Sequence, residues 1–139
     1  LRNMFVTLVY GRLTLSTGAL EYCNAGHNLP LIIRTDGDIS FTDKSKGIGL
    51  CLKADFEYRQ QTLQLSQGDT LFMYTDGITE AVNSDGVMFG EENLLDVVRT
   101  HSDSEVASLI ESVRDEVEQY VGNEPKSDDL TLMALRYVG

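Results

Sequence analysis

Apolar residues in the first half of the chain recur with a period of two, which is typical of β-strands. Residues 4–15 carry apolar side chains on both faces, so this segment is expected to be a strand covered on both sides. Turn signals at Ser16-Thr17-Gly18 and Asp36-Gly37 predict two hairpins. The pattern predicts strands over residues 4–15, 19–25, 31–34, 39–42, 56–65 and 70–74. Taken in order, with a loop over residues 43–53, they predict an antiparallel meander.

The second half of the chain changes to a helical period. A short helix is expected where Glu91 and Glu92 precede an apolar run, because acids favour the first turn of a helix. A longer helix is expected from a capping box formed by Ser102 and Glu105 to a C-cap at Gly122. Its apolar face consists of Val106, Leu109, Ile110, Val113 and Val117. A final strand over residues 130–138 completes a single α+β domain, residues 1–139.

Composition narrows the class of protein. With 139 residues, 42% of them hydrophobic, the chain is large enough for one folded core. A net charge of −11 argues against a nucleic-acid partner, since such proteins are basic. No apolar run approaches the roughly 20 residues of a membrane span, and no signal peptide is visible. Cys23 and Cys51 are expected to be free thiols, which fits a cytoplasmic location.

Aspartates stand at the ends of two expected strands. Asp76 follows the strand 70–74, and Asp128 and Asp129 precede the last strand. If those two strands are neighbours, the carboxylates meet at one sheet edge and repel one another unless a cation lies between them. Oxygen ligands of this kind suit Mg²⁺ or Mn²⁺. The alternative is structural, because Asp-Gly is a common turn signal and Asp before a strand is ordinary.

The segment "NAGHN", residues 24–28, is a second candidate. His27 can ligate a metal or exchange protons, but a single loop histidine is also a common structural hydrogen-bonding group. His101 is expected at a helix end, where the helix dipole alone accounts for it. Asp85-Gly86 is expected to be only a turn.

Three segments together resemble a known family. They are "MFVTLVYGRLTLSTGALEYCNAGHNLPLII", "GDTLFMYTDGITEAVNSDGVMFGEENL" and "SDDLTLMALR". In order and spacing they are similar to the bacterial serine phosphatases of the sporulation-protein-E and sigma-factor-regulator type. Those enzymes belong to the metal-dependent PPM superfamily, which includes eukaryotic protein phosphatase 2C. The resemblance covers nearly the whole chain and implies an αββα sandwich with a two-metal site at one edge.

The resemblance also implies roles for individual residues. Asp76 and Asp128 match metal-binding aspartates of the family. Asp129 takes a position that is often Asn in eukaryotic relatives, and Glu80 matches an acidic position that can help hold a more weakly bound third metal, so both are further candidate ligands. His27 falls where eukaryotic relatives carry an aspartate at an additional metal site. We therefore expect His27, Asn28 and Gly77 to line the site, and two Mn²⁺ or Mg²⁺ ions to be the cofactors.

One family motif is missing from the chain. The family carries a D-x-S-G-[HK]-G-like segment whose aspartate bridges both metals, and this sequence has no equivalent. We expect that segment upstream of Leu1, so that the chain is the C-terminal part of a domain whose N-terminal part is missing. This fragment alone is then expected to be a weak or inactive catalyst. Loss of the helices that cover one sheet face also predicts self-association.

The resemblance implies hydrolysis of phosphoserine or phosphothreonine on a regulatory protein, such as an anti-sigma-factor antagonist. A sensor domain is expected upstream in the parent protein. Two alternatives remain open. The domain could bind the same partner without turnover, as a pseudophosphatase, or it could be purely structural with Asp76 as a turn residue.

Overall fold

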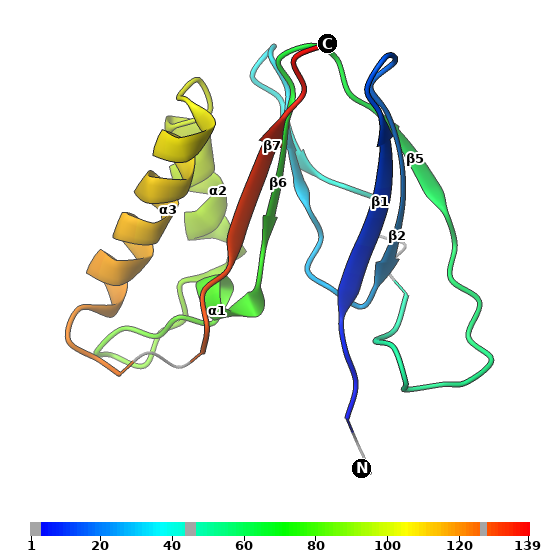
Figure 1. Cartoon of the computed structure of the whole chain (residues 1–139). Helices are drawn as coiled ribbons and strands as arrows, with labels where there is room; N and C mark the ends of the chain where they lie inside the picture. The colour runs from blue at the N-terminus through cyan, green and yellow to red at the C-terminus, as the bar shows by residue number, and fades with distance from the viewer. Residues whose placement is uncertain (1–3, 44–46, 126–127) are drawn as a thin grey trace.

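The fold consists of two antiparallel sheets and one layer of helices, as the computed structural model in Figure 1 shows. The structure describes residues 4–43, 47–125 and 128–139. The elements in chain order are β1 (Leu8–Thr14), β2 (Ala19–Ala25), β3 (Leu31–Ile33), β4 (Ile39–Phe41), β5 (Gln61–Gln64), β6 (Thr70–Tyr74), α1 (Asp76–Thr79), α2 (Gly90–Thr100), α3 (Val106–Val121) and β7 (Leu132–Arg136).

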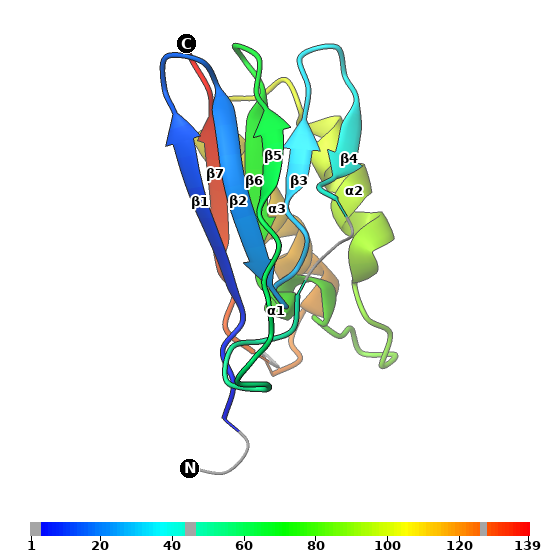
Figure 2. The same cartoon turned by 90° about the vertical axis from the view of Figure 1, so that its right-hand side faces the viewer.

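The strands are divided between the sheets in the orders β1-β2-β5 and β4-β3-β6-β7. The expected meander is therefore wrong, although both predicted hairpins are confirmed. The chain leaves the first sheet after β2, builds β3 and β4 in the second, and returns for β5. A meander was expected because alternation identifies strands but not their partners. The two sheets face one another, and α2 and α3 cover the outer face of the second one (Figures 1 and 2).

Alternating side chains of the second sheet build two cores. Phe72 and Tyr74 of β6 point toward the helices and pack with Leu94, Leu109 and Val113. Leu71 lies on the opposite face of β6 and packs between the sheets in a separate cluster. Because both faces of β6 are buried, its sequence reads as a continuous apolar run.

Several predicted boundaries differ from the structure. Strand β1 begins at Leu8 instead of residue 4 and lies at a sheet edge, where Tyr10 is 70% exposed. Residues 56–60 are not strand, and only Gln61–Gln64 pair with β2. The first sheet carries no helix on its outer face within the described residues, which is why the expected two-sided covering of β1 is wrong. The expected loop over residues 43–53 is seen at residue 43 and residues 47–53, and its residues 44–46 lie outside the described part.

The helices largely follow the sequence pattern. Leu109, Val113 and Val117 of α3 are fully buried, and Gly122 is its C-cap. The predicted capping box is wrong, because α3 begins at Val106 and the Ser102 hydroxyl instead donates to the carbonyl of Arg99. The Asp85-Gly86 turn is confirmed, and so is the place of His101 at the end of α2. Both cysteines are free, and no described helix is long and apolar enough to cross a membrane.

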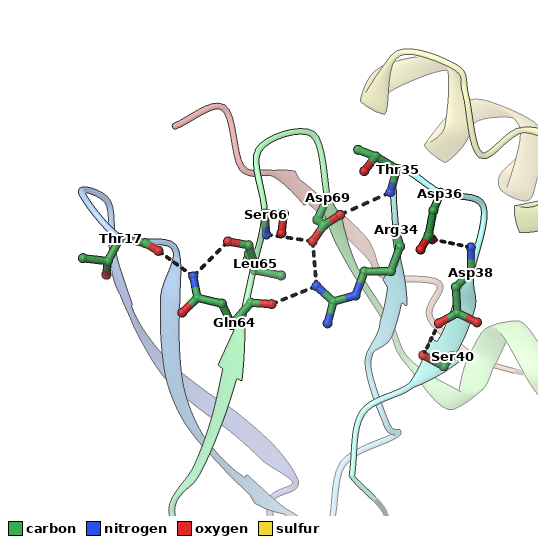
Figure 3. Close-up of polar contacts among 10 residues, drawn as sticks. All are labelled: Thr17, Arg34, Thr35, Asp36, Asp38, Ser40, Gln64, Leu65, Ser66 and Asp69. Carbon is green, nitrogen blue, oxygen red and sulfur yellow. Dashed lines mark hydrogen bonds and ion pairs between the residues drawn. The ribbon is translucent and has the colours of Figure 1, made fainter.

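An ion pair between Arg34 and the buried Asp69 joins the ends of β3 and β6 within the second sheet, at one end of the sandwich (Figure 3). The Asp69 carboxylate, before β6, accepts hydrogen bonds from Arg34 Nη1 at 2.6 Å, Ser66 N at 2.8 Å and Thr35 N at 3.2 Å. Arg34, after β3, also donates to the carbonyl of Gln64 in β5, at 2.8 Å. Burial alone would raise the pKa of Asp69, but these donors outweigh it and hold the pKa below its usual value.

Replacing Asp69 with Ala is expected to lower the free energy of unfolding by about 3 kcal/mol, because several donors lose their acceptor together. Since the folded-state pKa is lowered, this contribution is complete above the unfolded pKa of about 4 and is lost as the pH falls through the folded value. Urea unfolding between pH 7 and pH 3 measures both effects. Asp96→Ala, which breaks the exposed Asp96–Arg99 pair, is the control and should cost less than about 1 kcal/mol. Equal losses in both variants would contradict the assignment.

Candidate metal site

The pairing of β6 with β7 brings the segments that carry the candidate carboxylates to the same end of the sheet. The two strands are antiparallel, and the pair Tyr74↔Leu132 lies at the end where β6 finishes and β7 begins. Asp76 follows that pair on one strand, and Asp128 and Asp129 precede it on the other. The predicted neighbourhood of the two strands is therefore confirmed. The side chains of Asp76, Asp128 and Asp129 are exposed at this edge.

Thr75 fastens the two segments to each other. Its backbone N–H donates to the carbonyl of Thr131 at 3.1 Å, and its hydroxyl donates to the carbonyl of Asp129 at 3.2 Å. The same hydroxyl accepts from the N–H of Thr131 at 3.0 Å. The residue between the strand and Asp76 thus continues the pairing beyond the sheet, which fixes the backbone of the aspartates relative to one another.

Gly77 allows the closest approach of these segments. A Cβ at this position would lie 2.5 Å from the carbonyl oxygen of Asp129, which is closer than real Cβ contacts. Gly77 is buried in α1, directly after Asp76. A side chain here would force the Asp128–Asp129 segment outward, so the glycine of "TDG" is required by packing against the second aspartate segment.

Glu80 lies at the C-cap of the four-residue helix α1, where its N–H donates to the carbonyl of Asp76 at 2.8 Å. It is exposed and lies at the end of this helix. Asp128 uses one carboxylate oxygen to accept from the N–H of Asp129 at 2.7 Å. The other oxygen of Asp128 has no such bond within the described residues.

The segment containing His27 flanks Asp76 from the other side of β6. Strand β3 pairs with β6, with Leu31 opposite Phe72, so the residues before β3 lead to the end of β6 where Asp76 lies. The Asn24 side chain shapes this segment by accepting from His27 N at 2.8 Å and donating to its carbonyl at 3.0 Å. The Thr7 hydroxyl lies 3.0 Å from His27 Nδ1.

A cleft of about 290 Å³ lies between the His27 segment and the strand ends next to Asp76. His27 and Thr7 line one side of it, Thr75 and Thr131 line the other, and its remaining surface is mostly apolar. A second cavity, of about 280 Å³, lies between the sheets, is mainly apolar and contains none of the candidate carboxylates. The first cleft is the one that adjoins the strand end leading to Asp76.

Tyr74, the last residue of β6, carries a buried hydroxyl beside this edge. Burial, reinforced by the nearby negative charge of Glu91, raises the pKa of Tyr74 to about 12. The Asn28 side chain is close enough to oppose part of that rise. It does not reach hydrogen-bonding geometry, because the Tyr74 oxygen has no hydrogen-bond partner within the described residues.

The donor set can be compared with the needs of a divalent cation. Exposed carboxylates from two segments provide the oxygen ligands that Mn²⁺ and Mg²⁺ prefer. Among residues 4–43, 47–125 and 128–139, however, no group of three or more His, Cys, Asp or Glu side chains is arranged to hold a metal. The described residues by themselves therefore do not form a metal site, and the metal roles of Asp76, Asp128, Asp129 and Glu80 stay predictions.

Thr7, Thr75 and Tyr74 were not expected from the sequence as parts of this region. Thr75 and Tyr74 lie inside the "YTDG" motif, so the motif contained the signal, but a strand pattern does not reveal hydrogen bonds beyond the strand end. The Thr7–His27 contact joins residues 20 positions apart and had no local signal.

Comparison with known proteins agrees with this architecture. The structure matches the phosphatase domain of the cell-fate determinant SpoIIE from Bacillus subtilis, presoaked with Mn, with a TM-score of 0.74 and 19% identity over 95% of this chain and 56% of that one. The fold is therefore that of PP2C-type phosphatase domains, of which this chain forms part. The chain belongs to the Stage II sporulation protein E (SpoIIE) family, whose sequence model matches residues 1–138.

Two curated relatives align over nearly the whole chain. Protein IcfG of Synechocystis sp. (strain ATCC 27184 / PCC 6803 / Kazusa) is 29% identical over 95% of this chain and 20% of its own length. Phosphoserine phosphatase RsbU of Bacillus subtilis (strain 168) is 27% identical over 96% of this chain and 39% of its own length. The chain thus spans well under half the length of these relatives.

Replacing Gly77 with Ala is expected to lower the free energy of unfolding by about 2 kcal/mol, because the new methyl group meets a backbone carbonyl. Backbone amide shifts of Asp128 and Asp129 should change with it. Gly11→Ala is the control, since the nearest atom to its Cβ would be a terminal methyl group of Leu20, at 3.1 Å, which can rotate away. Urea unfolding and NMR measure the two effects. Unchanged shifts at Asp128 and Asp129 would show that the close approach does not position them.

Proposed function

We propose that this chain is the C-terminal part of a metal-dependent phosphatase that hydrolyses phosphoserine or phosphothreonine on a regulatory protein. The proposal is carried by the β6–β7 pairing, which brings Asp76 and the Asp128–Asp129 segment to one edge. Family membership supports it, as does the activity named for the RsbU relative. The substrate we propose is a phosphorylated partner-switching protein of the anti-sigma-factor-antagonist type.

In this mechanism Asp76 and Asp128 hold the cations, and Asp129 and Glu80 add further oxygen ligands. When bound, Mn²⁺ or Mg²⁺ ions acidify water to a usable nucleophile and neutralise charge on phosphoryl oxygens. Thr75 and Gly77 keep the two aspartate segments at a fixed separation. His27 lines the cleft that we propose receives the phosphorylated side chain, and Asn28 follows it in the same segment. No serine or cysteine nucleophile is needed.

The rest of the parent protein is part of the proposal. We infer that the bridging D-x-S-G aspartate lies upstream, together with a sensor domain, and that the protein works in the cytoplasm. The uncovered outer face of the β1-β2-β5 sheet supports contact with further protein, either the missing part of the domain or a second copy of the chain.

A second candidate is a pseudophosphatase that binds the same partner without hydrolysis. It is favoured by one observation, the lack of a three-ligand metal cluster within the described residues. The two candidates differ in their dependence on metal. Turnover requires the cation, whereas recognition of a partner by a pseudophosphatase persists in excess chelator.

Asp76→Asn is expected to abolish Mn²⁺ binding that isothermal titration calorimetry detects for the wild-type chain. The carboxylate supplies charge as well as an oxygen ligand, and the amide lacks the charge. Asp85→Asn, in the neighbouring turn, is the matched control and should bind like the wild type. Without metal, Asp76→Ala should change the free energy of unfolding by no more than about 0.5 kcal/mol, because the side chain is exposed. Equal Mn²⁺ binding by Asp76→Asn and the wild type would remove Asp76 from the site.

A longer chain that includes the upstream motif is expected to hydrolyse p-nitrophenyl phosphate in Mn²⁺ and to lose at least about tenfold in rate in excess chelator. The 139-residue chain should be far slower, because it lacks the bridging carboxylate. Release of p-nitrophenol, followed by absorbance, measures both rates. Turnover that is insensitive to chelator would contradict a metal mechanism.

A further inference from the structure

The cavity between the two sheets lies beside the edge strands β1 and β7. Its volume is about 280 Å³, and residues from the inner faces of both sheets line it, among them Leu13 of β1, Leu71 of β6 and Leu135 of β7. β1 and β7 are edge strands on the same side of the sandwich (Figures 1 and 2). An apolar space of this size is unfavourable by itself, because protein interiors are close-packed and the lining atoms lose contacts. The cavity therefore calls for an occupant.

Gly11 is the residue that leaves this space open. Val9, Gly11 and Leu13 form the inner row of β1 and all line the cavity, but only Val9 and Leu13 pack against the inter-sheet core. Local geometry does not require this glycine, because its φ is not positive and the nearest atom to an added Cβ is a methyl group of Leu20, at 3.1 Å. A glycine inside a strand weakens the strand and often marks the close approach of a ligand or another backbone. Gly11 is exposed, so the cavity can be reached from this edge.

The lining restricts what the cavity can hold. None of the described residues that line it is charged, so an ionised group would lose its hydration there without gaining a partner. The polar side chains of the lining are Thr42 and Tyr22, and the Tyr22 hydroxyl already donates to Gln61 at 2.5 Å. They are too few for a group of ordered waters, each of which needs about two to four polar partners. A cavity of about 150 Å³ holds benzene, so this one has room for a bicyclic aromatic ring. Met73 and Met133 add flexible thioethers, which make favourable contacts with aromatic rings.

We propose that the inter-sheet cavity is a binding site for a small, neutral, bicyclic aromatic molecule, and that its occupancy changes the cleft beside Asp76. The two spaces share a wall, because Val9, Met73 and Met133 line both of them. Met73 and Met133 are cross-strand partners in the β6–β7 pairing, next to the pair at which β6 ends. A ring packed against these methionines therefore contacts the strand end that leads to Asp76. The site itself rests on the cavity and does not need the proposed phosphatase activity.

Indole, a neutral bicyclic aromatic, is the probe for this site. In an NMR titration of the 139-residue chain it should shift the methyl signals of Met73, Met133 and Leu135 along one saturable curve. The backbone amide signal of Thr75 should move with the same midpoint. Indole should also raise the thermal midpoint of unfolding, because it binds the folded state. Indole-3-acetate, which adds a carboxylate to the same ring, should bind at least about tenfold more weakly, since no described lining residue offers a cation.

Gly11→Val is the central variant, because its side chain takes up part of the space between Val9 and Leu13. Indole affinity should fall at least about tenfold, while the thermal midpoint without indole should stay equal to that of the wild type or rise. Leu135→Phe fills the cavity from the opposite sheet and carries the same expectation if Gly11→Val does not fold. Thr14→Val is the matched control. It places a valine in the outer row of β1, outside the cavity, and should bind indole like the wild type.

Saturable binding that either filling variant weakens supports the site. The site is overturned if the lining methyl signals show no saturable shift, or if the wild type and both filling variants bind indole equally. Shifts at the lining methyl groups with none at Thr75 would overturn the link to the cleft and leave the site standing. A longer chain that includes the upstream motif is the last sample. If it does not bind indole while the 139-residue chain does, the upstream segment fills the cavity and the proposal is overturned. Loss of binding as the protein concentration rises would assign the cavity to a second copy of the chain and overturn the proposal as well.

Discussion

The antiparallel pairing of β6 with β7 is the contact on which the candidate chemistry depends. It joins the end of one buried strand to the beginning of another that lies more than 50 residues later, as the Thr75–Asp129 separation of 54 residues shows. Thr75 extends the pairing past the sheet, and Gly77 lets the second segment approach without a steric barrier. The backbone segments that carry the aspartates are therefore close to one another because of strand register. The contacts that hold them there are made by Thr75 and Gly77.

This arrangement places like charges together on a chain that already carries a net charge of −11. Such a cluster is acceptable at an exposed edge, where water screens it, and would be costly in the interior. The buried acid in the fold, Asp69, follows the opposite rule and is surrounded by donors that include Arg34. The sandwich thus has a closed, internally neutralised end and an open end whose carboxylates lack a cationic partner among the described ion pairs.

Much of the local structure was predictable because it depends on neighbours in sequence. The two hairpins, the helix that buries Leu109, Val113 and Val117, and the Gly122 C-cap follow from period and turn chemistry. The predictions that failed concern strand pairing, because a hydrophobic pattern does not specify which strands are neighbours. Alternation did not show that β2 pairs with β5, and an apolar segment did not reveal that β1 lies exposed at an edge. The capping box failed because Ser102 found a nearer acceptor in the carbonyl of Arg99.

The sequence by itself determined the family, the positions of the candidate acids near strand ends, and the glycine that directly follows Asp76. It could do so because motifs record which residue types a site needs. Only the tertiary structure decided which strands are neighbours, how Thr75 joins the Asp129 segment, and that the hydroxyl of Tyr74 is buried with no hydrogen-bond partner among residues 4–43, 47–125 and 128–139. The physical reason is that strand pairing and side-chain satisfaction depend on residues far apart in the chain. Those contacts are fixed by the packing of two sheets and a helical layer, which no local pattern encodes.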